Sequence, residues 1–316
     1  MRIFWNEQYT SSGYEFDTTR KSDWIVKRLR DEHDDTYEVT DPAKHYGETV
    51  RIIRNVHDDE YVDSVWTGEP RPLAESNGFD WDGNAYISAV AHSAGLIGAV
   101  DAAMTDRFAG SLSSGLHHAR TNRGNGFCTF NGLAVAAKYA ADKYGIEPVI
   151  LDLDAHAGGG TVEMLTHNGI EAKHLDVTVS QFDTYDYTPV GGLNIVLNTW
   201  GDQLRTDVEY LNAVKYALSC IPHGSLVIYN AGMDLVPDIS RTAIERRERM
   251  VAQHLWDNSN TAAFALAGGY TWSQTKQELV DLHMLTIDQF TAKAEAHEAA
   301  ETLGYYDRPV DTRGAA

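Results

Sequence analysis

The 316-residue sequence has only two cysteines, Cys128 and Cys220, and eight prolines. Two cysteines do not make the disulfide framework that stabilises small secreted domains, so we expect both to be buried thiols. No proline-rich or glycine/serine-rich linker interrupts the chain, and we therefore expect one domain over residues 1–316. Its last segment, 305–316, lacks hydrophobic periodicity and is expected to be a loosely docked tail.

Long apolar runs are missing too. Nowhere do 18 apolar residues follow one another, and the N-terminal segment MRIFWNEQYTSS lacks the apolar stretch of a signal peptide. These features predict a cytoplasmic protein that does not enter a membrane.

Basic residues are scarce, because 26 Lys and Arg stand against 46 Asp and Glu and leave a net charge of −20. A field of this sign repels nucleic acid, so we expect no DNA or RNA partner. Two explanations of the charge stay open. One is solubility or a salty medium, and the other is attraction for substrates that carry an amine.

What the chain does contain is a series of short apolar runs that alternate with longer stretches of helical period. This pattern predicts a single α/β domain in which helices cover both faces of a mostly parallel central sheet. We expect strands at 2–5, 109–113, 148–154, 172–177, 194–198, 225–231 and 262–267. We expect helices at 20–31, 86–106, 132–144, 207–220, 242–258 and 287–303.

Polar motifs follow several of the predicted strands. Asp152 and Asp154 end the Val-Ile-Leu strand, Asp234 follows a second strand, and Tyr270 follows a third. Ligands bind beyond the carboxyl ends of the strands in open parallel sheets, so these residues can converge although they are distant in sequence.

Asp154, His156 and Asp234 have the composition of a hydrolytic metal site. They would give a divalent ion two carboxylate ligands and one imidazole, and they would leave a position open for water and a substrate carbonyl. Asp234 would be a buried carboxylate without a partner unless it meets a cation, and a metal ion is the simplest candidate.

The adjacent residues His117 and His118 can act as a base and as an acid or electrostatic partner, and Tyr270 can turn its hydroxyl toward an oxyanion. Each motif also has a purely structural explanation. The histidines can be ordinary core or surface residues, Tyr270 can be an aromatic residue at a strand end, and one aspartate can cap the helix that begins near Thr161. The glycine run 158–160 suggests a phosphate-binding loop only weakly, because no Gly-Lys-Ser/Thr follows it.

Two longer motifs carry a resemblance to a known family. The first is Gly-Leu-His117-His118-Ala-Arg followed by Gly-Phe127-Cys128 and Asn131, and the second is Asp-Leu-Asp-Ala-His at 152–156. In both, the chain resembles the zinc-dependent deacetylases, which include histone deacetylases and acetylpolyamine amidohydrolases. The resemblance spans most of the chain and implies the arginase/deacetylase fold.

The resemblance implies a metal centre in which Asp154, His156 and Asp234 bind Zn²⁺, with Fe²⁺ as the alternative ion in the cell. It also implies a structural K⁺ near Asp152.

The resemblance further implies the roles of the surrounding residues. His118 would be the general base, and His117 would be its electrostatic or acid partner with Asp152 hydrogen-bonded behind it. Tyr270 would polarise the scissile carbonyl, and Phe127 would form one wall of a narrow channel for an acyl-amine side chain.

The opposite wall is expected from residues 181–189, where Phe182, Tyr185 and Tyr187 are candidates. Acidic residues expected near the rim, where solvated loop charge is the simpler explanation for each, are Asp80, Asp82, Asp183 and Asp186.

The sequence departs from the family pattern at Ala157 and Gly159, where the family has a second histidine and an Asp or Asn that supports the base. We therefore expect the base to have lost its orienting partner, which would lower activity unless another residue takes its place.

The leading hypothesis is a zinc-dependent amidohydrolase that acts on a small acylated amine, such as an acetylated polyamine, a small amine or a lysine side chain. One alternative is a catalytically weak or silent protein that binds a metal or ligand, motivated by Gly159. The other is an arginase-like hydrolase with two manganese ions, for which Asp234 and Asp238 do not have the required spacing. The sequence is compatible with a homo-oligomer.

Overall fold

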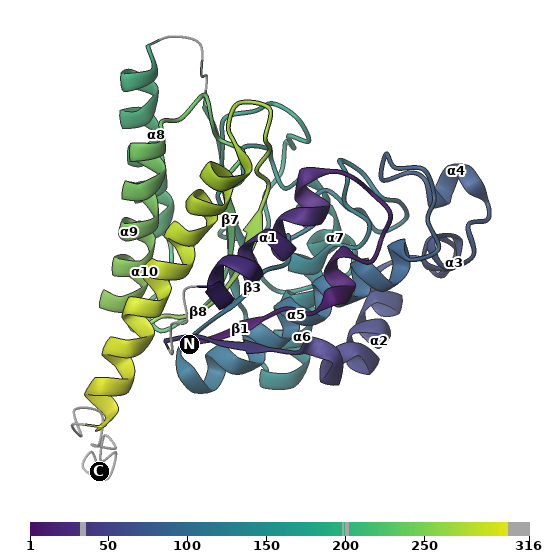
Figure 1. Ribbon diagram of the computed structural model, residues 1–316, viewed down its shortest axis with the longest axis horizontal. Helices are drawn as coiled ribbons and strands as arrows, with labels where there is room; N and C mark the ends of the chain where they lie inside the picture. Colours follow the sequence, from purple (N-terminus) through teal and green to yellow (C-terminus); the bar gives the residue numbers. More distant parts are fainter. Residues whose placement is uncertain (32–35, 198, 200–201, 303–316) are drawn as a thin grey trace.

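The computed structural model describes residues 1–31, 36–197, 199 and 202–302 (Figure 1). The described residues form one eight-stranded sheet in the order β2-β1-β3-β8-β7-β4-β5-β6, and every neighbouring pair is parallel. The strands are β1 (Arg2–Phe4), β2 (Glu38–Thr40), β3 (Phe108–Ser111), β4 (Val149–Asp152), β5 (Lys173–Thr178), β6 (Leu193–Val196), β7 (Leu226–Gly232) and β8 (Thr261–Ala267).

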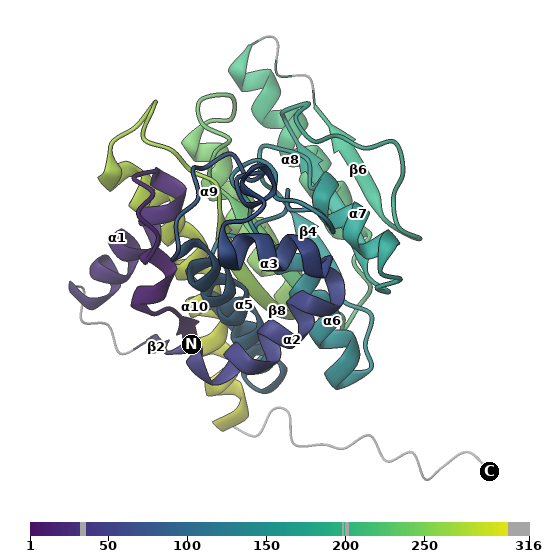
Figure 2. The same ribbon diagram turned by 90° about the vertical axis from the view of Figure 1, so that its right-hand side faces the viewer.

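Helices cover both faces of this sheet, as Figures 1 and 2 show. One face packs against α1 (Asp17–Asp31), α8 (Gln203–Ser219), α9 (Arg241–Asp257) and α10 (Lys276–Thr302). The other face packs against α2 (Tyr46–Val56), α3 (Asp59–Thr67), α5 (Ala85–Asp106), α6 (Gly132–Tyr144) and α7 (Gly159–His167). The shorter elements are α4 (Arg71–Ala74) and two 3₁₀ helices, η1 (Glu7–Thr10) and η2 (Pro42–His45).

The central strands are apolar along their whole length because both of their faces are buried. In β8, Ala262 and Phe264 belong to the core on the α9 side, whereas Ala263 and Ala265 belong to the core on the α5 side. Close packing within the sheet also selects small residues. A Cβ added at Gly110 of β3 would lie 2.6 Å from Cε1 of the Phe264 ring on the neighbouring strand.

By length and composition alone, α5 is the one helix of the described residues that could cross a membrane. However, 83% of the most apolar 18-residue stretch of α5 is buried inside the fold, between the sheet and the neighbouring helices. An apolar surface all around a helix is typical of a core position, which is where α5 lies.

The predicted fold class is confirmed, and seven of the eight strands lie where the apolar runs place them. Three predictions are wrong in detail. The strand β2, which has only three residues, and the helices α2, α3 and α4 were not predicted. In addition, α10 begins at Lys276 rather than at residue 287, and Cys220 is half-buried, unlike the buried Cys128. The predicted tail at 305–316 and the predicted boundaries at 198 and 303 lie outside the described residues.

Candidate metal centre and active site

The site is built beyond the carboxyl ends of four neighbouring strands, β3, β8, β7 and β4. The segment after β3 carries His117 and His118, and the segments after β8, β7 and β4 carry Tyr270, Asp234 and Asp154. All five side chains line one cavity. The convergence expected from the placement of the motifs is therefore present.

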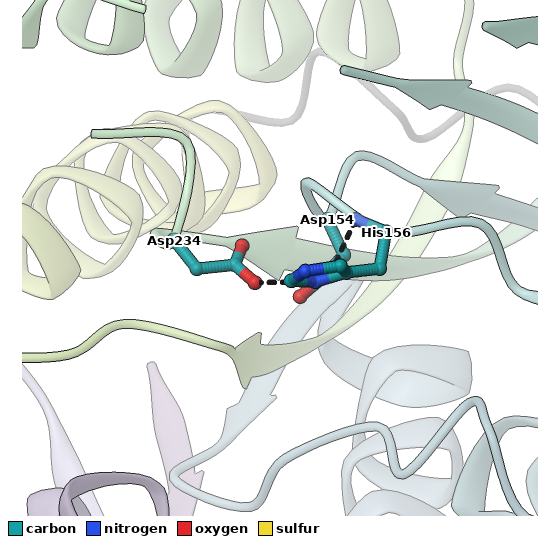
Figure 3. Close-up of side chains that lie close together, drawn as sticks. All are labelled: Asp154, His156 and Asp234. Atoms are coloured by element: carbon teal, nitrogen blue, oxygen red, sulfur yellow. Dashed lines mark hydrogen bonds and ion pairs between the residues drawn. The ribbon is translucent and has the colours of Figure 1, made fainter. Parts of the chain in front are cut away.

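Asp154, His156 and Asp234 form the one group among the described residues whose ligand atoms suit a metal ion, and these atoms lie within 4.8 Å of one another. Nδ1 of His156 lies 2.9 Å from Oδ2 of Asp234 and 3.2 Å from Oδ1 of Asp154 (Figure 3). The two carboxylates are almost completely removed from solvent, with side-chain exposures of 4% and 2%.

Glycines let the strand ends approach closely enough to form this group. A Cβ at Gly268, whose φ is +53°, would lie 2.7 Å from Oδ1 of Asp234 and 2.9 Å from Oδ2 of Asp154. A Cβ at Gly232 would lie 2.9 Å from the main-chain nitrogen of Asp154. In addition, the main-chain N–H of Ala155 donates to Oδ1 of Asp234 over 3.0 Å and fixes that carboxylate against the end of β4.

The electrostatics of this group call for a cation. Burial, and then the negative charge of Asp154, raise the pKa of Asp234. Two carboxylates this close are stable together in ionised form only when positive charge lies between or beside them. One imidazole nitrogen and two carboxylate oxygens are a ligand set that divalent transition metals accept, so the residues present fit a metal ion.

The two adjacent histidines have opposite electrostatic environments although their ring centroids are only 4.0 Å apart. For His117, burial lowers the pKa, but the charges of Asp152 and Asp154 outweigh it and raise the pKa to about 10. For His118, burial and the neighbouring charge of His117 lower the pKa to about 4, against the opposing effect of Asp183. His117 is therefore charged at neutral pH, and His118 is neutral.

Asp152 holds His117 in place from behind. Its Oδ2 lies 2.8 Å from Nδ1 of His117, and its Oδ1 accepts hydrogen bonds from the Asn230 side chain and from the main-chain N–H of Asp154. Burial acts to raise the pKa of Asp152, but the charge of His117 outweighs it and keeps the pKa low. Asp152 and His117 thus form a buried ion pair, as expected.

His118 also has a carboxylate partner, although position 159 does not supply it, and this matches the alternative in which another residue takes the place of the missing side chain. Its Nδ1 lies 2.9 Å from Oδ2 of Asp183, which is in the segment between β5 and β6. Asp183 was expected at the rim, but its side chain is only 3% exposed. It also forms an ion pair with Arg120. Sequence spacing gave no signal for this contact, because 65 residues separate His118 and Asp183.

Tyr270 and Phe127 lie where the cavity is lined by aromatic side chains. Tyr270 stacks on Trp272 with a centroid distance of 4.5 Å, and Phe16 contacts both Tyr270 and Phe127, at 5.4 and 4.6 Å. Burial, followed by the charge of Asp234, raises the pKa of Tyr270, so its hydroxyl stays protonated and can donate a hydrogen bond.

Of the three candidates for the opposite wall, Phe182 lies at the site. Its ring is edge-on to the rings of His118 and His156, at 4.9 and 5.8 Å. Tyr185 points inward instead, and its hydroxyl donates to Oδ2 of Asp176 over 3.0 Å. Tyr187 is about half exposed.

Lys21 of α1 is a further buried residue near the metal group that we did not expect. It is fully removed from solvent, its Nζ donates to the main-chain oxygen of Gly268, and burial lowers its pKa to about 7. A signal was present, because Lys21 lies four residues before Ile25 on the apolar face of α1. The ammonium group fixes the glycine turn that leads to Tyr270.

Comparison with known proteins agrees with this geometry. The model of the histone deacetylase domain matches residues 17–286, which is most of the chain. The chain belongs to the histone deacetylase family. This family generally binds a metal ion.

Individual relatives are more distant. An uncharacterized protein of Synechocystis sp. is 30% identical over 177 residues, which are 52% of this chain and 57% of that protein. An uncharacterized protein of Picosynechococcus sp. is 26% identical over 73% of this chain and 78% of its own length. The acetoin utilization protein AcuC of Staphylococcus aureus is 48% identical over 50 residues, which are 16% of this chain and 13% of AcuC.

Among solved structures, an acetylpolyamine aminohydrolase from Burkholderia pseudomallei superposes with a TM-score of 0.70. The match covers 93% of this chain and 99% of that chain at 16% sequence identity. At this identity the similarity shows that the two proteins share a fold.

Proposed function

We propose that this deacetylase-family protein is a zinc-dependent amidohydrolase that removes an acyl group from a small amine. One observation carries the proposal: Asp154, His156 and Asp234 lie in the same cavity as the histidine pair and Tyr270. A divalent ion bound there would lower the pKa of a water molecule and would polarise a substrate carbonyl. Zn²⁺ is the proposed ion, and Fe²⁺ is the alternative.

The side chains around the metal group have environments suited to amide hydrolysis. His118 is neutral and takes the proton of the attacking water at Nε2, because its Nδ1 faces Asp183. His117 stays protonated, and its positive charge stabilises the negative charge that develops on the former carbonyl oxygen. Neighbouring groups whose pKa values are pushed apart in this way are typical of acid/base pairs.

Two further residues complete the proposed reaction. Tyr270 donates a hydrogen bond to the oxyanion, and its raised pKa keeps the donor proton in place. When the C–N bond breaks, the departing amine takes the proton that His118 accepted from the attacking water, which returns His118 to its neutral form. Phe127 packs against the acyl chain of the substrate as one wall of the channel.

A cationic amine outside the acyl group is the proposed substrate class, such as an acetylated polyamine or a lysine side chain. The net charge of −20 supports it, because a negative field raises the local concentration of cations. The cytoplasmic location and a structural K⁺ near Asp152 stay predictions of the sequence. The alternative of a catalytically weak or silent protein was motivated by Gly159, and the contact of 2.9 Å between His118 and Asp183 favours the enzyme over that alternative.

The test is an assay of amine release by the zinc-loaded protein from acetylated polyamines, acetyl-lysine peptides and other short acyl amides. We expect release that a chelator stops and zinc restores. Asp234→Ala should abolish activity, and Tyr270→Phe should lower kcat by about 10²–10³-fold, as loss of an oxyanion donor does.

A second readout separates metal binding from catalysis. Zinc should raise the midpoint of thermal unfolding of the wild-type protein and of Tyr270→Phe, but not that of Asp234→Ala. Absence of release from every substrate, or equal release by the wild type and Asp234→Ala, would refute the proposed activity.

A further inference from the structure

Asp183 packs directly against Gly159 and can do so because position 159 has no side chain. A Cβ at Gly159 would lie 2.9 Å from Oδ1 of Asp183 and closer than 3.0 Å to the main-chain oxygen of the same residue. The space that a side chain at position 159 would need is therefore filled by Asp183. Position 159 begins α7, whereas Asp183 comes from the segment after the neighbouring strand β5.

The Asp183 carboxylate is fully engaged in contacts. Oδ2 lies 2.9 Å from Nδ1 of His118 and accepts a hydrogen bond of 3.1 Å from the main-chain N–H of Gly160. Oδ1 pairs with Arg120, whose other nitrogen, Nη1, lies 2.6 Å from Oε2 of Glu163. One guanidinium group, one helix N–H and one imidazole thus fix a carboxylate that is almost entirely buried.

The segment around Asp183 is also tied to the protein on both sides of this residue. The main-chain N–H of Ala157 donates to the oxygen of Phe182 over 3.2 Å. The Tyr185 hydroxyl donates to Asp176 over 3.0 Å and lies 3.1 Å from Nδ1 of His174. Asp183 itself has a φ of +60°, a conformation that Asp and Asn adopt more easily than most residues.

We propose that Asp183 is the positioning residue of His118, supplied by the β5–β6 segment in place of a side chain at position 159. This inference rests on the proposed function. Oδ2 of Asp183 accepts a hydrogen bond from Nδ1–H of the His118 imidazole, so that the unprotonated Nε2 faces the cavity and can take a proton from water. Arg120 and the main-chain N–H of Gly160 hold the Asp183 carboxylate in this position.

The same segment also carries Phe182 next to the base. The ring of Phe182 contacts the His118 ring, and the neighbouring residue Asp183 contacts Nδ1 of the same imidazole. The orientation of the base therefore depends on the segment that also borders the site. A carboxylate placed on α7 would not create this dependence.

The variant Asp183→Asn tests the proposal. Asparagine has the same shape and tolerates the same φ, but it lacks the charge and places an amide donor against either Arg120 or His118. We expect kcat to fall by about 10–100-fold with KM changed less than about threefold, as for loss of a residue behind a functional imidazole. Glu171→Gln removes the same charge at an exposed position and should leave both constants within about twofold.

A readout that needs no turnover accompanies the kinetics. Metal-free protein labelled with ¹⁵N-histidine should show a downfield Nδ1–H resonance that His118→Ala removes. We expect Asp183→Asn to lose or strongly shift this resonance and Glu171→Gln to keep it. An unchanged resonance in Asp183→Asn overturns the proposal, and so does an unchanged kcat. If the wild type releases no amine at all, the proposed function fails, and the resonance alone decides the role of Asp183.

Discussion

Asp183 fills the space that a side chain at position 159 would need, so a substitution of Gly159 should displace Asp183. A methyl group at position 159 meets the main-chain oxygen of Asp183 at less than 3.0 Å, and main-chain atoms yield less easily than the end of a flexible side chain. The β5–β6 segment would have to move away from α7. The carboxylate would then leave His118 and Arg120.

Gly159→Ala is therefore expected to lower kcat/KM by about tenfold or more, although it removes no functional group. The matched control is Gly47→Ala in α2, where a Cβ meets no atom within 4 Å. That control should keep full activity and gain up to about 1 kcal/mol of stability from the higher helix propensity of alanine. Amine release and urea unfolding of both variants measure these effects. Full activity of Gly159→Ala would show that the contact between Gly159 and Asp183 does not matter.

At the scale of elements, α9 is joined to the strand that carries the metal group through a buried ion pair. Arg247 and Glu248 are both fully buried, and their side chains lie 2.6 Å apart. Nη1 of Arg247 donates to the main-chain oxygen of Leu153, just before Asp154, and Tyr229 of β7 donates to Glu248. The pair therefore fixes the end of β4 and the middle of β7 relative to α9.

Arg247→Met is expected to lower the free energy of unfolding by about 3–5 kcal/mol, because it leaves the Glu248 charge buried without its partner. Arg246→Met, one residue away on the exposed side of α9, should change it by less than about 0.5 kcal/mol. Guanidinium chloride unfolding of the two variants and the wild type compares them directly. Equal stability of the two variants would mean that the buried pair contributes nothing.

The elements that the sequence predicted well are those whose patterns are local. The central strands are continuous apolar runs, and α6 was predicted with the bounds that the structure has. The start of α10 was missed, although Thr275 and Glu278 form a capping box, with each side chain bonded to the other's main-chain N–H. Reading that short motif would have placed the helix correctly.

The site residues that could be predicted from the sequence are likewise those whose pattern is local. The residues at strand ends converge because parallel strands finish at one edge of a sheet, and this can be seen in the sequence. The contact between Asp183 and His118 depends on how a segment of irregular backbone folds over α7. Neither periodicity nor spacing describes such a path, so the residue was assigned to the rim.

At the scale of the whole molecule, two buried histidines, His57 at the end of α2 and His92 in α5, connect these helices to the segment that follows β3. Nδ1 of His57 donates to the oxygen of Arg120, and its Nε2 accepts from the N–H of Asn131. Nδ1 of His92, in α5, accepts from the N–H of Ser114. Each ring can accept its hydrogen bond only while one of its nitrogens is unprotonated, and burial lowers the pKa of both histidines to about 4.

These histidines predict how global stability depends on pH. A histidine whose pKa is lower in the folded state binds more protons when unfolded, so its contribution to stability falls as the pH falls from about 6.5 toward 4. The groups that act in this sense are six histidines with lowered pKa values, His45, His57, His92, His118, His254 and His283. Four groups act in the opposite sense because their pKa is raised: Asp176 to about 7, Asp234, His117 to about 10 and His156 to about 11.

Because the six histidines with lowered pKa values outnumber the four opposing groups by two, we expect the metal-free protein to lose stability between pH 7 and pH 5. The full effect of each group in excess is about 1.4 kcal/mol per pH unit and acts over roughly 1.5 units below pH 6.5, so the loss should be about 2–4 kcal/mol. Urea unfolding at pH 7, 6 and 5 measures it. His57→Gln, which keeps a donor and an acceptor but does not titrate, should show a smaller loss than the wild type. Stability that is constant or higher at pH 5 would mean that these histidines are not held neutral in the fold, and the hydrogen bonds that fix the segment after β3 would need another explanation.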